Sequence, residues 1–154
     1  MFLPPTGAER SANWQQRFGC GIAADIANLV KRTETIIVAV RPTQIDDALS
    51  GLPWRDEQTI ISVCAGVPIS AFERHVAGAR VIRTLPVTAA EFGASPTTVF
   101  PDDPLVSKLF SSCGPIIALS SEEEFEAASM LGCYYGWAQA LVAEIAKWLI
   151  NNGM

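Results

Sequence analysis

Basic residues are few in this chain of 154 residues, which carries 11 Lys and Arg against 16 Asp and Glu. The net charge is −5, and no basic cluster appears, so the electrostatic footprint of a nucleic-acid or anionic-membrane binder is absent. Long hydrophobic runs are also missing, since none reaches the roughly 18 to 20 residues of a membrane span. Met1–Pro5 is too short and uncharged for a signal peptide. We therefore expect a cytoplasmic protein.

Cysteine and histidine are sparse and scattered. The cysteines are Cys20, Cys64, Cys113 and Cys133, with no C-x-x-C pair, and His75 is the only histidine. A zinc site would have to be assembled from distant segments, so we expect no metal and interpret the cysteines as small buried hydrophobes in a reducing compartment. The stretch around His75 has no nucleophile signature, which disfavours a Ser-His-Asp or Cys-His system.

Short apolar runs rich in β-branched residues alternate with helical stretches. The runs predicted to be strands are Thr35–Val40, Thr59–Val63, Arg80–Leu85 and Pro115–Leu119. The first two are apolar almost throughout, which is typical of parallel strands covered on both faces. With 49% hydrophobic residues, the pattern predicts an α/β fold with an open parallel sheet.

Helix signals lie between these strands and beyond them. Predicted helices cover Gly7–Phe18, Asp25–Lys31 with Asp25 as N-cap, Thr43–Leu49 capped by Thr43, Pro68–Val76 and Asp102–Ser112. A longer helix is predicted after Ser120 or Ser121, which form a capping box with Glu123 or Glu124, and it stops at Asn151–Gly153. We expect an α/β domain over residues 1–120 and a helical segment over 121–154.

The long helix carries an apolar stripe that we expect to form a subunit interface. Its residues recur at helical spacing: Leu131, Tyr134, Ala138, Leu141, Ile145 and Trp148. At 1.5 Å per residue the helix spans roughly 40 Å, longer than one face of a small α/β domain requires. The sequence therefore predicts a homodimer through Leu131, Leu141, Ile145 and Trp148. The alternative is that Trp148 is buried against its own α/β domain.

A dinucleotide-binding domain would need a strand, then G-x-G-x-x-G, then a helix, because only glycine lets the backbone approach the pyrophosphate. The chain has no such motif, since Gly7, Gly19 and Gly21 lack the spacing. It opens on Phe2-Leu3-Pro4-Pro5, which reads as the end of a strand.

Three segments stand in order along the chain: AVRP at Ala39–Pro42, SVCAGVPISAFE at Ser62–Glu73 and RTLPVT at Arg83–Thr88. Their residues and spacing resemble the pyrroline-5-carboxylate reductase family. The similarity continues through Asp102–Gly114 into Glu122–Ser129 and covers roughly residues 7 to 142. Members of that family have a Rossmann-like NAD(P)-binding domain followed by a helical dimerisation domain. Compared with them, this sequence looks truncated at both ends. It lacks the first strand, the glycine-rich loop and most of the dimerisation domain.

The resemblance implies a site and a reaction. Ala39, Val40, Arg41 and Pro42 would line NADP or NAD, and Cys64, Ala65 and Gly66 would pass close to the nicotinamide. Both segments follow predicted parallel strands, where open α/β sheets bind ligands, although Pro42 and Gly66 could be ordinary turn residues. Thr88 and Tyr134 are the expected catalytic residues. The implied chemistry is hydride transfer to a C=N bond of a small substrate, as in proline biosynthesis, and it needs no metal.

Two departures from the family pattern bear on the substrate. Val87 stands where the family has the Asn of M-P-N-T-P, and it cannot hydrogen-bond through its side chain. Gly132-Cys133-Tyr134-Tyr135 stands where the family has S-G-S-G, so two bulky phenols replace a close backbone approach. Three hypotheses remain: an oxidoreductase of this family or a diverged relative, a non-catalytic dimerising α/β module derived from it, or an unrelated α/β domain.

Overall fold

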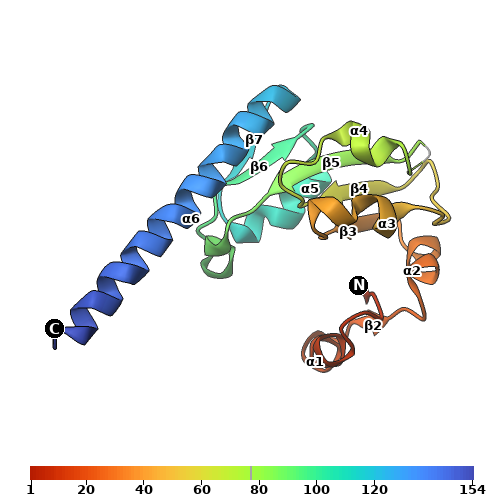
Figure 1. The fold of residues 1–154 in the computed structure, drawn as a ribbon. Helices are drawn as coiled ribbons and strands as arrows, with labels where there is room; N and C mark the ends of the chain where they lie inside the picture. The colour runs from red at the N-terminus through yellow and green to blue at the C-terminus, as the bar shows by residue number, and fades with distance from the viewer. Residues whose placement is uncertain (77) are drawn as a thin grey trace. The chain divides into compact units, whose positions relative to one another are not determined.

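The computed structural model describes residues 1–76 and 78–154, which form two compact units, Met1–Arg83 and Thr84–Met154. The labelled elements can be followed along the chain in Figure 1. The first unit contains β1 (Phe2–Leu3), α1 (Ala8–Phe18), β2 (Gly21–Ile22), α2 (Ile26–Arg32), β3 (Thr35–Val38), η1 (Pro42–Gln44), α3 (Ile45–Leu49), β4 (Thr59–Ser62) and α4 (Ile69–Glu73). The strand β5 (Arg80–Leu85) runs across the boundary between the units.

Two separate sets of parallel strands build the first unit. The strands β1 and β2 pair with each other in a two-stranded sheet. The strand β3 pairs in parallel with β4, and β4 with β5. All four residues of β4 are buried, as expected for a parallel strand covered on both faces. The core around it includes Ile60 and Phe72, both 0% exposed.

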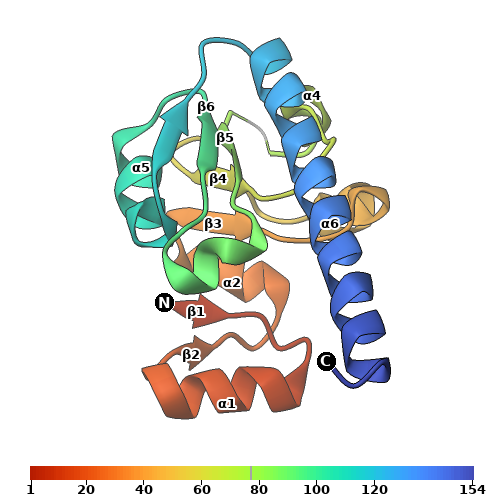
Figure 2. The ribbon, with the colours of Figure 1, turned by 90° about the vertical axis from the view of Figure 1, so that its left-hand side faces the viewer.

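Hydrogen bonds from side chains stabilise both ends of α2. The Asp25 carboxylate accepts a hydrogen bond of 2.6 Å from the Asn28 amide and caps α2, as the sequence predicted. At the other end of α2, Gln58 Nε2 donates to the carbonyls of Val30 and Thr33 at 2.7 and 2.8 Å. Helix α1 follows β1, and Figure 2 shows it beside the β1–β2 pair.

The second unit pairs two strands in parallel and ends in a long helix. Its elements are η2 (Thr88–Phe92), β6 (Thr97–Phe100), α5 (Pro104–Phe110), η3 (Ser111–Cys113), β7 (Ile116–Ala118) and α6 (Glu122–Asn151). Ser121 accepts a hydrogen bond from the Glu124 amide, and Glu124 Oε2 accepts one from the Ser120 amide. This reciprocal capping explains why α6 begins where the sequence predicted.

The α/β fold with parallel strands is confirmed, and several details differ from the sequence predictions. The predicted cap at Thr43 is wrong, because η1 occupies Pro42–Gln44 and α3 starts only at Ile45. The strand β6 was not predicted, since it has only four residues and lies between Pro96 and Pro101. The two compact units meet between Arg83 and Thr84. The predicted boundary between residues 120 and 121 lies instead just before α6, which begins at Glu122.

Candidate functional site

The two segments predicted to contact a dinucleotide lie at neighbouring strand ends of the first unit. Ala39–Pro42 directly follow β3, and Cys64–Gly66 come shortly after β4, whose Ser62 is in register with Val38. The Cys64 thiol lies 3.2 Å from the Val40 carbonyl oxygen and 3.5 Å from that of Val38. The fold therefore brings the two predicted segments together at the carboxyl edge of the sheet.

Gly66 forms the open part of this edge. Its φ is +68°, a left-handed conformation that favours glycine, and no atom lies within 4 Å of where a Cβ would stand. By contrast, Cys64 is buried at 5% exposure. The neighbouring backbone at Arg41 is fixed by its own N–H, which donates to Gln44 Oε1 at 3.3 Å. The site is thus a pair of backbone turns, one of them open to an approaching ligand.

The predicted catalytic residues both belong to the second unit. Thr88 is the first residue of η2, whereas Tyr134 lies on α6. Tyr134 and Tyr135 line an apolar cavity of about 290 Å³ together with Val87 and Thr98. The Thr98 hydroxyl is buried and has no hydrogen-bond partner in the described part of the chain. The cavity therefore brings together the two positions at which this chain departs from the family pattern.

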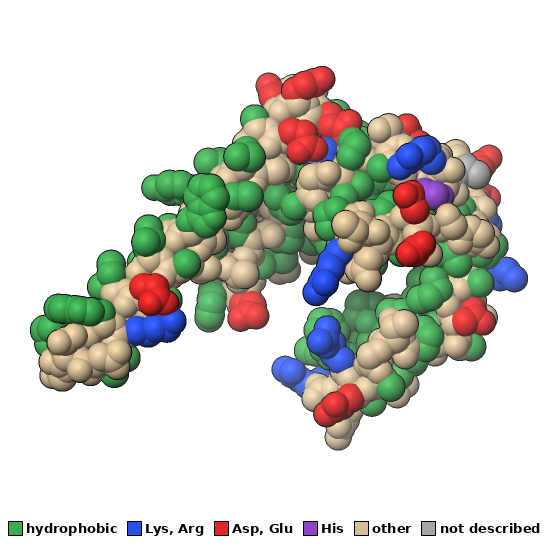
Figure 3. Space-filling view, in the orientation of Figure 1, with side chains coloured by type: hydrophobic (Ala, Val, Ile, Leu, Met, Phe, Trp, Pro, Cys, Tyr) green, Lys and Arg blue, Asp and Glu red, His purple; other side chains and the backbone are tan. Residues whose placement is uncertain are grey.

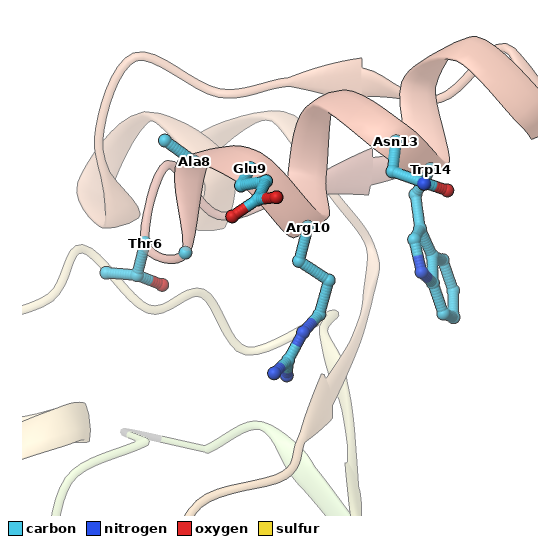
Figure 4. A pocket seen from close by; sticks show the side chains of 7 residues that line it. Thr6, Ala8, Glu9, Arg10, Asn13 and Trp14 are labelled. Carbon is cyan, nitrogen blue, oxygen red and sulfur yellow. The ribbon is translucent and has the colours of Figure 1, made fainter.

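A polar groove lies at the start of α1, and the sequence analysis did not predict it. Thr6, Glu9, Arg10, Asn13 and Trp14 line this groove, whose volume is about 850 Å³. Figure 4 shows the Arg10 and Trp14 side chains extending to the same side of the helix. The N-cap is Gly7, and no side chain caps the helix, so its first amide groups and the Arg10 guanidinium offer a favourable environment for an anion. Gly7 followed three residues later by Arg10 was the available signal.

His75 has neighbours that the sequence did not predict. Its Nε2 lies 2.7 Å from Asp46 Oδ1, and its Nδ1 lies 3.4 Å from Ser50 Oγ. The sequence around His75 does not reveal these partners, because Ser50 and Asp46 come from the α3 region while His75 follows α4. The hydrogen bond from His75 and the charge of Arg74 lower the pKa of Asp46. These contacts tie the end of α4 to α3.

The cysteines differ in exposure. Cys20 and Cys64 are buried as expected, but Cys133 is exposed because it lies on the outer surface of α6. Over residues 1–76 and 78–154, no group of three or more His, Cys, Asp or Glu side chains is arranged to hold a metal ion. In the same residues, no helix is both long and apolar enough to cross a membrane.

Comparisons with known proteins found similar oxidoreductases. Residues 5–66 match the family model described as NADP oxidoreductase, coenzyme F420-dependent. The chain is 32% identical over 90 residues to a pyrroline-5-carboxylate reductase of Methanosarcina acetivorans, and the match covers 56% of this chain and 33% of that protein. It is 30% identical over 97 residues to pyrroline-5-carboxylate reductase 1 of Bacillus spizizenii, covering 61% and 33%. The matches thus span about one third of these relatives.

Solved structures show the same fold. The 1-pyrroline-5-carboxylate reductase of Streptococcus pyogenes superposes with a TM-score of 0.82 at 21% identity, covering 99% of this chain and 61% of that one. The Plasmodium falciparum pyrroline carboxylate reductase with NADP bound gives a TM-score of 0.73 at 19% identity, covering 88% and 56%. The sequence matches and the shared Rossmann-like fold agree with the motifs at residues 39–42 and 62–73 and support the resemblance of this chain to the pyrroline-5-carboxylate reductase family.

Proposed function

We propose that this protein works as an NADP-dependent oxidoreductase that transfers a hydride to the C=N bond of a small substrate. The proposal rests on the contact between the segments that follow β3 and β4. There the Cys64 thiol contacts the Val40 carbonyl, beside the exposed turn at Gly66. Ligands of open parallel sheets bind at such carboxyl edges. This edge also lies within residues 5–66, which match the NADP oxidoreductase model.

The residues present fit part of a dinucleotide. The turns at Ala39–Pro42 and Cys64–Gly66 would hold the nicotinamide side, because Gly66 leaves open space for a planar ring. The start of α1, with Thr6 and Arg10, would bind the phosphate that distinguishes NADP from NAD. When bound, the nicotinamide supplies the hydride. The sequence contains no glycine-rich loop to cradle the pyrophosphate, so we expect this chain alone to bind NAD(P)H weakly or not at all.

The substrate side of the proposal rests on the second unit. Thr88 and Tyr134 offer hydroxyl groups for a polar imine or carbonyl, and Thr98 adds a buried hydroxyl in the cavity beside Tyr134. Val87 and the two tyrosines make this cavity apolar, so a substrate with an apolar body fits it better than pyrroline-5-carboxylate does. Filling a small-residue pocket with phenols costs binding through overpacking. We therefore expect little reduction of pyrroline-5-carboxylate, and turnover comparable to that of ordinary family members would refute this substrate assignment.

Isothermal titration calorimetry with NADPH tests the cofactor assignment. We expect a dissociation constant weaker than the low micromolar range, and we expect NADH to bind more weakly still. Arg10→Ala should abolish the difference between the two cofactors, whereas Arg17→Ala, at the opposite end of α1, should leave it unchanged. Low micromolar binding would mean that the phosphate site is elsewhere, and an unchanged preference in Arg10→Ala would remove α1 from the site.

A second candidate function, a non-catalytic dimerising module, is favoured by the surface of α6. Five of its large side chains are 60–69% exposed: Leu131, Tyr134, Leu141, Ile145 and Trp148. Figure 3 shows hydrophobic side chains along the length of this helix. A contiguous apolar strip of this kind is unusual on a monomer and marks an interaction surface. We propose that it pairs with the same strip of a second copy about a two-fold axis.

Light scattering on the wild type and on Leu141→Glu with Ile145→Glu tests the dimer. We expect a wild-type dimer at tens of micromolar and a monomeric double variant, because two carboxylates would then be buried without partners. Glu144→Gln with Lys147→Gln, which alters an exposed ion pair on the same helix, is the control and should remain dimeric. A wild-type monomer, or a double variant that stays dimeric, would refute the interface.

A further inference from the structure

The last turn of α6 is followed by the dipeptide Asn152-Gly153. Helix α6 runs to Asn151, and Asn152 is its C-cap. Gly153 has a φ of +74°, and no atom lies within 4 Å of where its Cβ would stand. Both residues of the dipeptide are exposed to solvent, and Figure 1 shows this end of the helix. The carboxamide of Asn152 therefore meets water and precedes the one residue type that has no side chain to shield its backbone nitrogen.

Backbone hydrogen bonds close this turn in the arrangement known as the Schellman motif. The Gly153 N–H donates to the Ile150 carbonyl at 3.1 Å, and the Met154 N–H donates to the Leu149 carbonyl at 3.0 Å. This pair of bonds forms when the residue after the cap adopts the left-handed conformation, which glycine does without strain. The helix end therefore favours a glycine directly after Asn152.

The side chain of Asn152 takes part in the same turn. Its Nδ2 donates to the Trp148 carbonyl at 2.8 Å. The backbone N–H of Asn152 lies 3.1 Å from the Trp148 carbonyl oxygen and 3.1 Å from that of Leu149. While the turn is closed, the Asn152 carboxamide and the Gly153 N–H are thus each bonded to a different helix carbonyl. They become available to react with each other only when these bonds open.

We propose that Asn152 is a site of spontaneous deamidation and that opening of the last turn of α6 controls the reaction. In the open turn, the Gly153 nitrogen loses its proton to solvent and attacks Cγ of Asn152. A C–N bond forms, and the Cγ–Nδ2 bond breaks. Nδ2 takes up a proton from solvent and leaves as ammonia. Water then opens the resulting succinimide ring at either carbonyl, which leaves aspartate or isoaspartate.

The reaction is expected to be selective for this asparagine. Each of the three other asparagines is followed by a residue whose side chain shields the attacking nitrogen, and each lies within the bounds of a helix: Asn13, Asn28 and Asn151. A helical backbone keeps the following N–H in the hydrogen-bonded ladder. Asn152 differs in both respects, because it stands outside the helix and precedes glycine.

The product weakens the turn from which it forms. A carboxylate only accepts hydrogen bonds, so it cannot donate to the Trp148 carbonyl. Its negative charge is also unfavourable at a helix C-terminus. Isoaspartate adds a methylene to the main chain, which displaces the Gly153 and Met154 N–H groups from the Ile150 and Leu149 carbonyls. Deamidation is therefore expected to loosen the end of α6, where the Trp148 side chain is 60% exposed.

Peptide mapping by mass spectrometry, on the whole chain incubated at neutral pH, tests the proposal. A blocked peptide that copies Trp148–Met154, too short to hold a stable helix turn, is incubated in parallel. We expect aspartate and isoaspartate to accumulate at Asn152 before the other asparagines change. Conversion should be slower in the folded chain than in the peptide, by up to about tenfold, since a helix end opens readily. An unchanged Asn152 after the peptide has converted would overturn the proposal, and equal rates would contradict control by the turn.

Two matched variants change the opening of the turn and keep Asn152 and Gly153 in place. Ile150 is 71% exposed, and glycine there destabilises a helix more than alanine does. Ile150→Gly should therefore deamidate about threefold faster than Ile150→Ala. Circular dichroism verifies that both variants fold. Equal rates in the two variants would contradict control by the turn.

A substitution at the attacking residue separates ring closure from direct hydrolysis by water. Gly153→Ala strains the left-handed position and opens the turn, but the new Cβ shields the backbone nitrogen. Attack by this nitrogen predicts slower conversion than in the wild type, with isoaspartate among the products. Conversion that is faster than in the wild type, or that yields aspartate alone, would show direct hydrolysis and overturn the proposed reaction.

Discussion

The strand β4 of the first unit and the helix α6 of the second use apolar residues in opposite ways. In the first unit, the residues of β4 and the Phe72 side chain are buried, and the candidate site consists of backbone turns at strand ends. In the second unit, α6 leaves Leu131, Leu141 and Ile145 at least 60% exposed. The same residue types therefore stabilise the core around β4 and form an exposed surface on α6. Hydrophobic periodicity alone does not tell whether a stripe is buried in the fold or exposed.

Truncating one aromatic residue in each unit should give the largest difference in stability between a buried and an exposed position. Phe72→Ala empties a fully buried position and should lower the free energy of unfolding by about 3–5 kcal/mol. Tyr134→Ala, at a position 69% exposed, should change it by less than about 0.5 kcal/mol in a monomer. Urea denaturation at low protein concentration measures both. Equal losses would show that Tyr134 is packed in solution.

Two glycine substitutions should have effects of opposite sign. Gly66→Ala places a side chain on a residue at φ +68° and should destabilise the protein by about 1–2 kcal/mol. Gly136→Ala lies in the middle of α6, where no atom is within 4 Å of the new Cβ, and should stabilise it by about 0.5–1 kcal/mol. Thermal unfolding measures the pair. A destabilising Gly136→Ala would reveal a close neighbour at that helix position.

The smallest expected effect concerns the contact between Asp46 and His75. The pKa of Asp46 is lowered in the folded protein, chiefly by its hydrogen bond with His75, so the unfolded chain binds this proton more readily. The stabilisation is therefore present above the ordinary carboxyl value near 3.8 and is lost as the pH falls through the lowered pKa. Asp46→Asn should be slightly less stable than the wild type at pH 6, and this difference should shrink as the pH falls below 3.8. Asp47→Asn serves as the control, and a difference that grows as the pH falls below 3.8 would contradict this assignment.

Much of the fold could be predicted from local patterns. The strand at Arg80–Leu85 has the predicted bounds, and the caps at Asp25 and Ser121 were predicted because each depends on residues three apart. The cluster of His75, Asp46 and Ser50 could not be predicted, since it joins residues 25 and 29 positions apart.

Part of the candidate site could likewise be predicted from the sequence, and part could not. The strand ends at Ala39–Pro42 and Cys64–Gly66 could be located from the sequence because parallel strands end at one edge. The Cys64 contact with the Val40 carbonyl, which joins them, depends on the register between β3 and β4. The roles of Thr88 and Tyr134 remain predictions.

Backbone NMR of this chain, titrated with NADPH and then with NADH, tests whether the strand ends and the start of α1 bind the dinucleotide. We expect NADPH to shift the amide resonances of Arg41, Ala65 and Gly66 together with those of Gly7 and Arg10. NADH should shift the first three and leave Gly7 and Arg10 unchanged, because it lacks the phosphate assigned to α1. Shifts confined to other residues, or identical shifts with both nucleotides, would contradict the assignment of the dinucleotide to these strand ends and to the start of α1.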